Sequence, residues 1–216
     1  VVVEVVVELV QGDAVGQGFG EKLILVHFGE QFFAGAVGHL VGTGVFKGVG
    51  LLGGNPAALA EHDVFDLEAA LPLIWGRGIH SIFIGGGTPS LFAPATIDRL
   101  LGDIRARLRL EAQCEITLEA NPGTFEKDRF RAYRQAGVTR LSIGVQSFND
   151  SHLAALGRVH DGAQALAAVE EAAQSFDTFN LDIMYALPGQ TMAHLDQDVA
   201  TALQFAPPHI SIYHLT

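Results

Sequence analysis

The chain has 216 residues, of which 49% are apolar, and a formal net charge of −11. This length and composition predict a soluble globular protein, either one domain or part of a larger one. The negative charge argues against a basic nucleic-acid-binding surface, and no apolar run reaches the roughly 18 residues that a membrane-spanning helix needs. The single cysteine, Cys114, excludes a disulfide framework within the chain, which fits a cytoplasmic location.

Residues 1–60 differ in composition from the rest of the chain. They hold 13 of the 25 glycines, 13 valines and no arginine, and no helical period persists in them. Only residues 22–28, KLILVHF, predict a buried strand. Three interpretations stay open for this Gly/Val-rich segment: an unusual ordered region, a disordered extension, or non-native coding sequence such as a frame error. We therefore place the start of the core domain at residue 61.

From about Asp66 the pattern becomes regular, because apolar runs alternate with amphipathic segments. Strands are predicted over residues 79–85, 114–122, 138–147, 179–189 and 209–216. Residues 66–78 are predicted to be the end of a helix, and further helices are predicted over 93–110, 124–137, 149–157, 161–174 and 191–206. Thr124 is the expected N-cap and Gly137 the expected C-cap of the helix over 124–137.

The alternation of strands and helices predicts right-handed βαβ units around a parallel sheet. The strands are mostly apolar along their length, as expected when both faces of a sheet are covered. The fold class is therefore α/β. From the pattern alone, a (β/α) barrel and an open doubly wound sheet are both possible.

Polar residues recur where the predicted strands end, which is where ligands bind in parallel α/β folds. The strand ends carry, in order, Gly85-Gly86-Gly87-Thr88, Glu119 and Asn121, Gln146 and Ser147, Asp182 and Tyr185, and Tyr213, His214 and Thr216. Burying one such group without a partner costs about 1–3 kcal/mol, so the repeated pattern indicates a shared polar ligand. Arg158, after the third strand, is suited to grip a carboxylate.

Each of these residues also has a purely structural interpretation. The glycines of GGGTPS fit a tight turn, and they form neither a G-x-G-x-x-G fingerprint nor a P-loop. We expect Tyr185 to lie in the core and Cys114 to be a small buried hydrophobe. Asp103 and Arg107 are expected on a solvated helix face, and the histidines show no metal-ligand spacing.

Six motifs occur in order: GGGTPS, LEANPGT, RLSIGVQSF, LGRVH, NLDIMYALPGQT and HISIYHLT. Over residues 66–216 the sequence resembles the radical S-adenosylmethionine (SAM) proteins of the oxygen-independent coproporphyrinogen III oxidase-like family. Within this family it resembles the haem chaperone (HemW-type) branch. The resemblance implies a partial (β/α) barrel with parallel strands that binds SAM at the carboxyl ends of the strands.

The resemblance also implies which residues bind SAM. Gly86, Gly87 and Thr88 resemble the segment that meets the methionine part, and Thr216 aligns with a contact near the adenine. The other residues that match SAM contacts of the family are Glu119, Gln146, Arg158 and Asp182. We expect Arg158 to meet the methionine carboxylate, and Asp182 or Gln146 the ribose hydroxyls.

One departure from the family is evident. Its members hold a 4Fe-4S cluster through C-x-x-x-C-x-x-C after the first strand, and the corresponding stretch, near residues 22–40, contains no cysteine. We therefore expect a core fragment, truncated at its C-terminus, that keeps the SAM-binding wall but neither binds the cluster nor performs radical chemistry as written. Haem or a porphyrinogen is the implied partner of the parent family.

Two other interpretations stay open. The first is a cluster-free haem- or SAM-binding module, in which His160 or His214 could ligate haem. The second is an unrelated phosphate-binding α/β barrel enzyme.

Overall fold

The computed structural model describes residues 3–9, 23–28, 45–46, 67–68, 71–72, 74, 76–86, 88–124 and 128–215. The chain forms two compact units, Val1–Thr117 and Leu118–Thr216, and each is described by itself. The domain boundary predicted at residues 60 and 61 lies outside the described residues. No helix in the described part of the chain is long and apolar enough to span a membrane.

The first unit contains a mixed β-sheet. Its strands are β1 (Val3–Leu9), β2 (Leu23–Phe28), β3 (Val45–Phe46), β4 (Gly78–Gly85) and most of β5 (Arg109–Ala120), in the order β3-β2-β1-β4-β5. The predicted strand over 22–28 is confirmed as β2, and the one over 79–85 as β4. Strand β1 was not predicted, and it pairs antiparallel with both β2 and β4.

A short 3₁₀ helix, η1 (Pro89–Leu91), and helix α2 (Pro94–Arg107) follow β4. Pro94 stands at the first position of α2, where its missing N–H costs nothing. The buried residues Ile97, Leu100, Leu101 and Ile104 have the spacing of one helix face. The prediction of a helix up to residue 110 was too long, because Leu108 is extended (φ −115°, ψ 144°) and β5 begins at Arg109.

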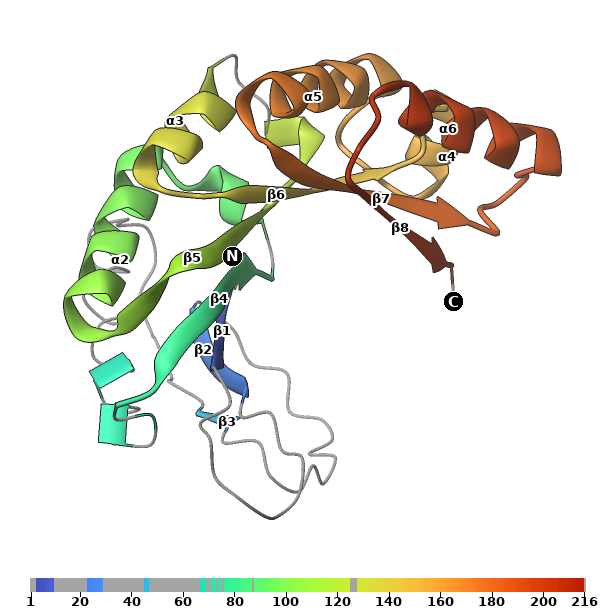
Figure 1. Ribbon diagram of the computed structural model, residues 1–216. Helices are drawn as coiled ribbons and strands as arrows, with labels where there is room; N and C mark the ends of the chain where they lie inside the picture. Colours follow the sequence, from blue (N-terminus) through green and yellow to red (C-terminus); the bar gives the residue numbers. More distant parts are fainter. Residues whose placement is uncertain are drawn as a thin grey trace. The chain divides into compact units, whose positions relative to one another are not determined.

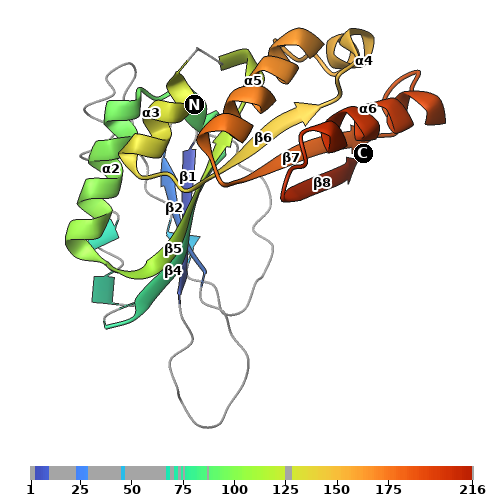
Figure 2. The same cartoon turned by 45° about the horizontal axis from the view of Figure 1, so that its top comes forward.

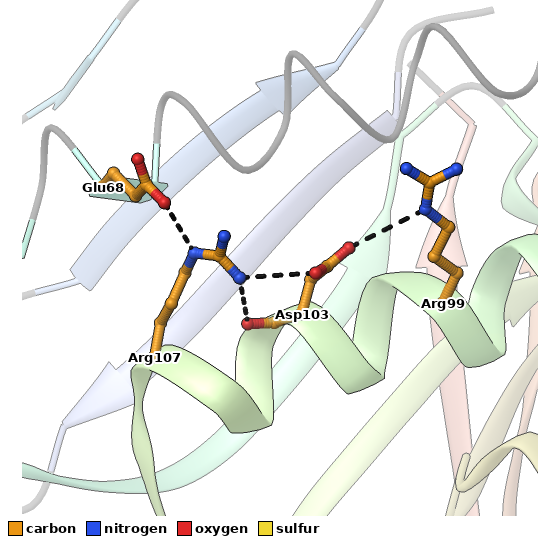
Figure 3. A network of polar contacts seen from close by, with 4 residues as sticks. All are labelled: Glu68, Arg99, Asp103 and Arg107. Atoms are coloured by element: carbon orange, nitrogen blue, oxygen red, sulfur yellow. Dashed lines mark hydrogen bonds and ion pairs between the residues drawn. The ribbon is translucent and has the colours of Figure 1, made fainter.

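Ion pairs join α2 to residue Glu68 (Figure 3). Arg107 Nε lies 2.9 Å from Glu68 Oε1, and Arg107 Nη1 lies 3.3 Å from Asp103 Oδ1. Arg99 Nε lies 4.0 Å from the other Asp103 oxygen. Arg107, expected on a solvated helix face, is thus held in ion pairs with its side chain 24% exposed. Partly exposed pairs of this kind contribute about 1 kcal/mol or less each.

The second unit alternates helices and strands. After the end of β5 come η2 (Pro122–Thr124), α3 (Arg129–Ala136), β6 (Arg140–Gln146), α4 (Asp150–Ala155), α5 (Gly162–Ser175), β7 (Thr178–Tyr185), α6 (Met192–Gln204) and β8 (His209–His214). Strands β6, β7 and β8 are parallel neighbours, as predicted. Figures 1 and 2 show α5 and α6 on one side of these strands.

The core of this unit lies between the helices and one face of the strands. Leu141, Ile143, Leu181 and Ile183 alternate along β6 and β7 and are fully buried. Helix α5 turns small residues such as Ala165 and Ala168 inward. Burying one large aliphatic side chain contributes about 1.5–3 kcal/mol, so this face fixes the register of the strands.

The start of α3 differs from the prediction. Thr124 belongs to η2, and α3 begins only at Arg129, after Asp128 in a left-handed conformation (φ 68°). The predicted C-cap is confirmed, because Gly137 has φ 107° and its N–H donates to the carbonyls of Tyr133 and Arg134. Capping boxes start α5 at Asp161 and α6 at Thr191.

Candidate functional site

Polar side chains from three strands meet on one face of the second unit's sheet. Asn180 Nδ2 donates to Asp182 Oδ1 (2.8 Å) and to Ser142 Oγ (3.0 Å). Ser142 Oγ donates to Asp182 Oδ2 (3.3 Å), and Ser211 Oγ donates to Asn180 Oδ1 (3.1 Å). Since side chains alternate along a strand, this face is opposite to the one that packs on the helices.

Asp182 lies within β7 rather than at its end, so its expected position was wrong. Its register partner is Ser211 of β8. Burial raises the pKa of the Asp182 carboxyl, while the neighbouring polar side chains of Asn180, Ser142, Ser211 and Tyr213 offset part of the rise. The side chain is thus a partly buried carboxylate that is held by neutral donors.

Gln146 ends β6 in a strained conformation. It has φ 62° and follows a bulge, because Ile143 pairs with Leu181 but Gln146 already pairs with Ile183. The side chain is 7% exposed, and its Oε1 has no hydrogen-bond partner. A Cβ on Gly144 would lie 2.9 Å from Gln146 Nε2, so the amide folds back over that glycine. A strained backbone and an unpaired buried oxygen are features of ligand sites.

The loop after β6 is anchored to α6 by a carboxylate. Asp198 is 2% exposed, accepts a hydrogen bond from Ser147 Oγ (2.6 Å) and accepts another from the Phe148 N–H (2.8 Å). Ser147 was expected at the ligand site, but its hydroxyl is used in this anchor. Asp198 was missed by sequence reasoning, since an acidic residue on an amphipathic helix gives no sign of burial.

Arg158 and His160 lie in the next loop, between α4 and α5. Arg158 is exposed, and its N–H donates to the Leu153 carbonyl (3.0 Å). His160 is 3% exposed and its Nε2 donates to the Val145 carbonyl (3.2 Å), which leaves Nδ1 as an acceptor without a partner. Burial lowers the pKa of His160, and Arg158 lowers it further.

The end of β5 meets this loop. Glu119 is half-buried one residue before the end of β5, and Asn121 Oδ1 accepts the Gly123 N–H (2.9 Å). A Cβ on Gly123 would lie 2.6 Å from a methyl group of Val159 and 3.6 Å from His160 Cβ. The structure therefore brings LEANPGT and LGRVH together.

Three of the predicted site residues belong to the first unit. Gly86 is half-buried with φ 76°, and Thr88 precedes η1, where its carbonyl accepts the Leu91 N–H (3.0 Å). Gly87 lies outside the described residues, as does Thr216 of the second unit.

Two further expectations failed. Tyr185 is 37% exposed rather than in the core, because it ends β7 and its ring meets His214 edge-on at 5.0 Å. Cys114 lies inside β5 and is only half-buried, and burial is the largest cause that raises its pKa to about 11. Among the described residues no group of three or more metal-ligating side chains comes together.

The polar network also contains residues that sequence reasoning missed, namely Ser142, Asn180 and Ser211. Asn180 and Asp182 are two residues apart, and this spacing on a strand was the available signal that they share a face. Their neighbours on β6 and β8 became visible only through the register of the sheet.

A comparison with protein families decides the family. The profile described as the radical SAM superfamily matches residues 66–202. The chain belongs to the radical SAM superfamily. Membership in it implies SAM and a 4Fe-4S cluster as the family's cofactors.

Among curated radical SAM relatives, the haem chaperone HemW of Haemophilus influenzae is 50% identical over 152 residues, which are 70% of this chain and 40% of that protein. HemW of Escherichia coli is 46% identical over 72% of this chain and 42% of its own. A bovine relative, the mitochondrial radical S-adenosyl methionine domain-containing protein 1, is 38% identical over 76% of this chain and 37% of its own. The chain thus spans about two fifths of the length of these relatives.

Among solved structures, coproporphyrinogen III oxidase (HemN) from Escherichia coli matches with a TM-score of 0.62 and 29% identity over 72% of this chain and 38% of its own. The methyltransferase TsrM from Kitasatospora setae matches at 0.54 with 12% identity over 71% of this chain and 30% of its own, which shows the fold alone. The predicted fold class, an α/β partial barrel of the radical SAM type, is confirmed by these matches.

Proposed function

We propose that this chain is the SAM-binding part of a radical SAM haem chaperone of the HemW type. The observation that carries the proposal is the 50% identity to the Haemophilus influenzae haem chaperone over 70% of the chain. The similarity to HemN supports a role in haem metabolism as the broader class. The proposal places the protein in the cytoplasm, with SAM and haem or a porphyrinogen as its small-molecule partners.

The residues proposed to bind SAM are Gly86, Gly87, Thr88, Glu119, Gln146, Arg158, Asp182 and Thr216. Three of them match the chemistry of SAM in this structure. Gln146 has a buried oxygen without a donor, which suits a ribose hydroxyl. Asp182 is a carboxylate held by neutral groups, and Arg158 is exposed and positively charged, which suits the methionine carboxylate.

The residues of this chain do not fit the cluster. Its three protein ligands are thiolates, and the sequence has one cysteine. That cysteine has a pKa raised to about 11, so it is a thiol at neutral pH. The proposed function of this chain is therefore the binding of SAM without the cluster.

A binding experiment tests the proposal. Equilibrium dialysis with radiolabelled SAM is expected to show saturable binding to the intact chain, which Arg158→Gln weakens about tenfold, as for the loss of one charge-assisted hydrogen bond. Arg131→Gln is the matched control, because Arg131 is also exposed and pairs only locally with Asp128 (3.0 Å). Equal affinities of the three proteins would remove Arg158 from the site.

Reconstitution with iron and sulfide is expected to give no 4Fe-4S absorption. A stoichiometric cluster would contradict the conclusion that this chain lacks the ligands.

The single cysteine favours a second candidate, a haem- or SAM-binding module that works without the cluster. The two candidate haem ligands, His160 and His214, differ in exposure. His160 is buried and donates through Nε2 to a backbone carbonyl, whereas His214 is exposed beside Tyr185. Haem titration should then show a Soret shift that is lost in His214→Ala and kept in His160→Ala. No shift in the wild-type chain would reject this candidate.

A further inference from the structure

The amide of Asn180 uses its whole hydrogen-bonding capacity inside the polar network. The side chain is 3% exposed. Its two amide hydrogens go to Asp182 Oδ1 (2.8 Å) and Ser142 Oγ (3.0 Å), and its oxygen accepts from Ser211 Oγ (3.1 Å). The residue thereby connects β6, β7 and β8 at one level of the sheet.

These contacts allow one orientation of the amide. A rotation by 180° would turn Asn180 Oδ1 toward the carboxylate of Asp182, so that two acceptors would face each other without a hydrogen. It would also leave the Ser211 hydroxyl facing an N–H donor. The orientation of Asn180 is thus fixed by its partners, and in turn it fixes one carboxylate oxygen.

The network leaves the carboxylate of Asp182 open to one more donor. Two carboxylate oxygens together accept about four hydrogen bonds. Asn180 donates to Oδ1 and Ser142 donates to Oδ2, which occupies two of these positions. Ser211 has a single hydrogen, which it donates to Asn180, so the carboxylate keeps acceptor capacity for a further hydroxyl group.

We propose that Asn180 is a positioning residue, which holds the Asp182 carboxylate so that its remaining acceptor position receives a ligand hydroxyl group. This inference rests on the proposed SAM function, in which the hydroxyl belongs to the ribose. Asparagine is required here because only an amide donates to both Asp182 and Ser142 while it accepts from Ser211. Leucine would make none of these bonds, and aspartate would only accept.

The other titratable or charged groups on this face are few. By strand alternation they are Glu119 on β5, Arg140 on β6, and His209 and Tyr213 on β8. Arg140 Nη2 and His209 Nδ1 lie 3.3 Å apart. None of the causes that shift the pKa of Asp182 is a charged group, so a second carboxylate at position 180 would dominate the titration of Asp182.

Asn180→Asp therefore gives a sharp test. It places a carboxylate oxygen where the amide nitrogen lies, 2.8 Å from Asp182 Oδ1, and two carboxylates this close share one proton. SAM affinity is expected to fall about tenfold or more near pH 8, where the pair repels, and to recover partly near pH 6, where a shared proton restores the missing donor. Wild-type affinity should change little between these two pH values.

Asn149→Asp is the matched control. Asn149 accepts hydrogen bonds from Ser151 and His152 at the start of α4, a role that aspartate also fills, so its SAM affinity should stay at the wild-type level. Ser211→Ala is a milder variant that keeps both amide hydrogen bonds, and we expect about a threefold weaker SAM affinity with no new pH dependence. An affinity of Asn180→Asp that matches the wild type, or falls equally at both pH values, would overturn the inference.

Failure of the proposed SAM binding can be distinguished from failure of the inference about Asn180. If the wild-type chain binds no SAM, the proposed function fails, and a ¹³C NMR titration of the Asp182 carboxyl carbon tests the positioning alone. Two coupled titration steps in Asn180→Asp, against one step in the wild type, would support it. A single unchanged step would overturn it.

Discussion

Gly162→Ala tests how the loop that carries Arg158 and His160 is closed. Gly162 is the first residue of α5, and a Cβ there would lie 2.3 Å from the carbonyl oxygen of Phe148. Real Cβ atoms essentially never come closer than 3.0 Å to a heavy atom outside their own residue and its two chain neighbours. Since the obstacle is backbone rather than a side chain, no rotamer change relieves it.

The loss of stability in Gly162→Ala depends on the hydrogen bonds that hold Gly162 and Phe148 in place. The Gly162 N–H donates to Asp150 Oδ1 (2.8 Å), and the Phe148 N–H donates to Asp198 Oδ1 (2.8 Å). Overpacking costs about 1–3 kcal/mol, and a weakened hydrogen bond to a carboxylate adds about 1.5 kcal/mol. The better helix propensity of alanine returns somewhat less than about 1 kcal/mol. We expect the free energy of unfolding to fall by about 2–3 kcal/mol.

Urea unfolding followed by far-UV circular dichroism measures this loss. Gly123→Ala is the matched control in the same unit, because the only close approach of its Cβ would be 2.6 Å to a methyl group of Val159, and that side chain is 80% exposed. The valine turns away at a cost below about 1 kcal/mol. If both variants lost the same stability, the distinction between backbone and side-chain obstruction would be refuted.

Three further predictions concern the site and the thiol. Gly144→Ala places a Cβ 2.9 Å from Gln146 Nε2, so the amide of Gln146 moves while the fold persists. SAM affinity in dialysis should fall about tenfold, with a change in the free energy of unfolding within about 1 kcal/mol. Unchanged affinity would contradict this. The pKa of Asp182 is raised above 3.8, so its contribution to stability is present below pH 3.8 and is lost as pH rises through the folded-state pKa. From pH 4 to 7, the wild type should therefore lose stability relative to Asp182→Asn in thermal unfolding. The opposite trend would show a lowered pKa. The pKa of Cys114 rises from 9.0 to about 11, so the fraction of thiolate at neutral pH falls about 100-fold, while the higher nucleophilicity of that thiolate offsets part of the loss. Iodoacetamide should therefore alkylate the folded chain about tenfold more slowly than the urea-unfolded chain. Equal rates would contradict the burial of the thiol.

Local patterns predicted the second unit well, because its elements are specified by short-range chemistry. The strands over 138–147, 179–189 and 209–216 and the helices over 149–157, 161–174 and 191–206 were found within a few residues of their observed ends. Errors occurred where local signals were ambiguous. Thr124 is a good N-cap residue, but the chain makes a 3₁₀ turn there, and Leu108 continued an apolar helix period into a strand.

The candidate site was only partly predictable, for a geometric reason. The residue types at Gln146 and Asp182 were found because they interrupt apolar strands. The strain at Gln146 depends on a bulge in the pairing of β6 with β7, which no local pattern in GVQ reveals. Likewise, Asp198 is buried only because α6 packs against the loop after β6.

The sequence by itself determined the class of this protein, since six motifs in order and alternating strands and helices suffice to assign a radical SAM α/β fold. It also determined that the three thiolates of the cluster are missing, because that is a count of residues. Only the tertiary structure decided which polar groups share a surface. The contacts of Asn180 with Ser142 and Ser211 join residues 38 and 31 positions apart, and such contacts are set by strand register, which arises from packing of the opposite face.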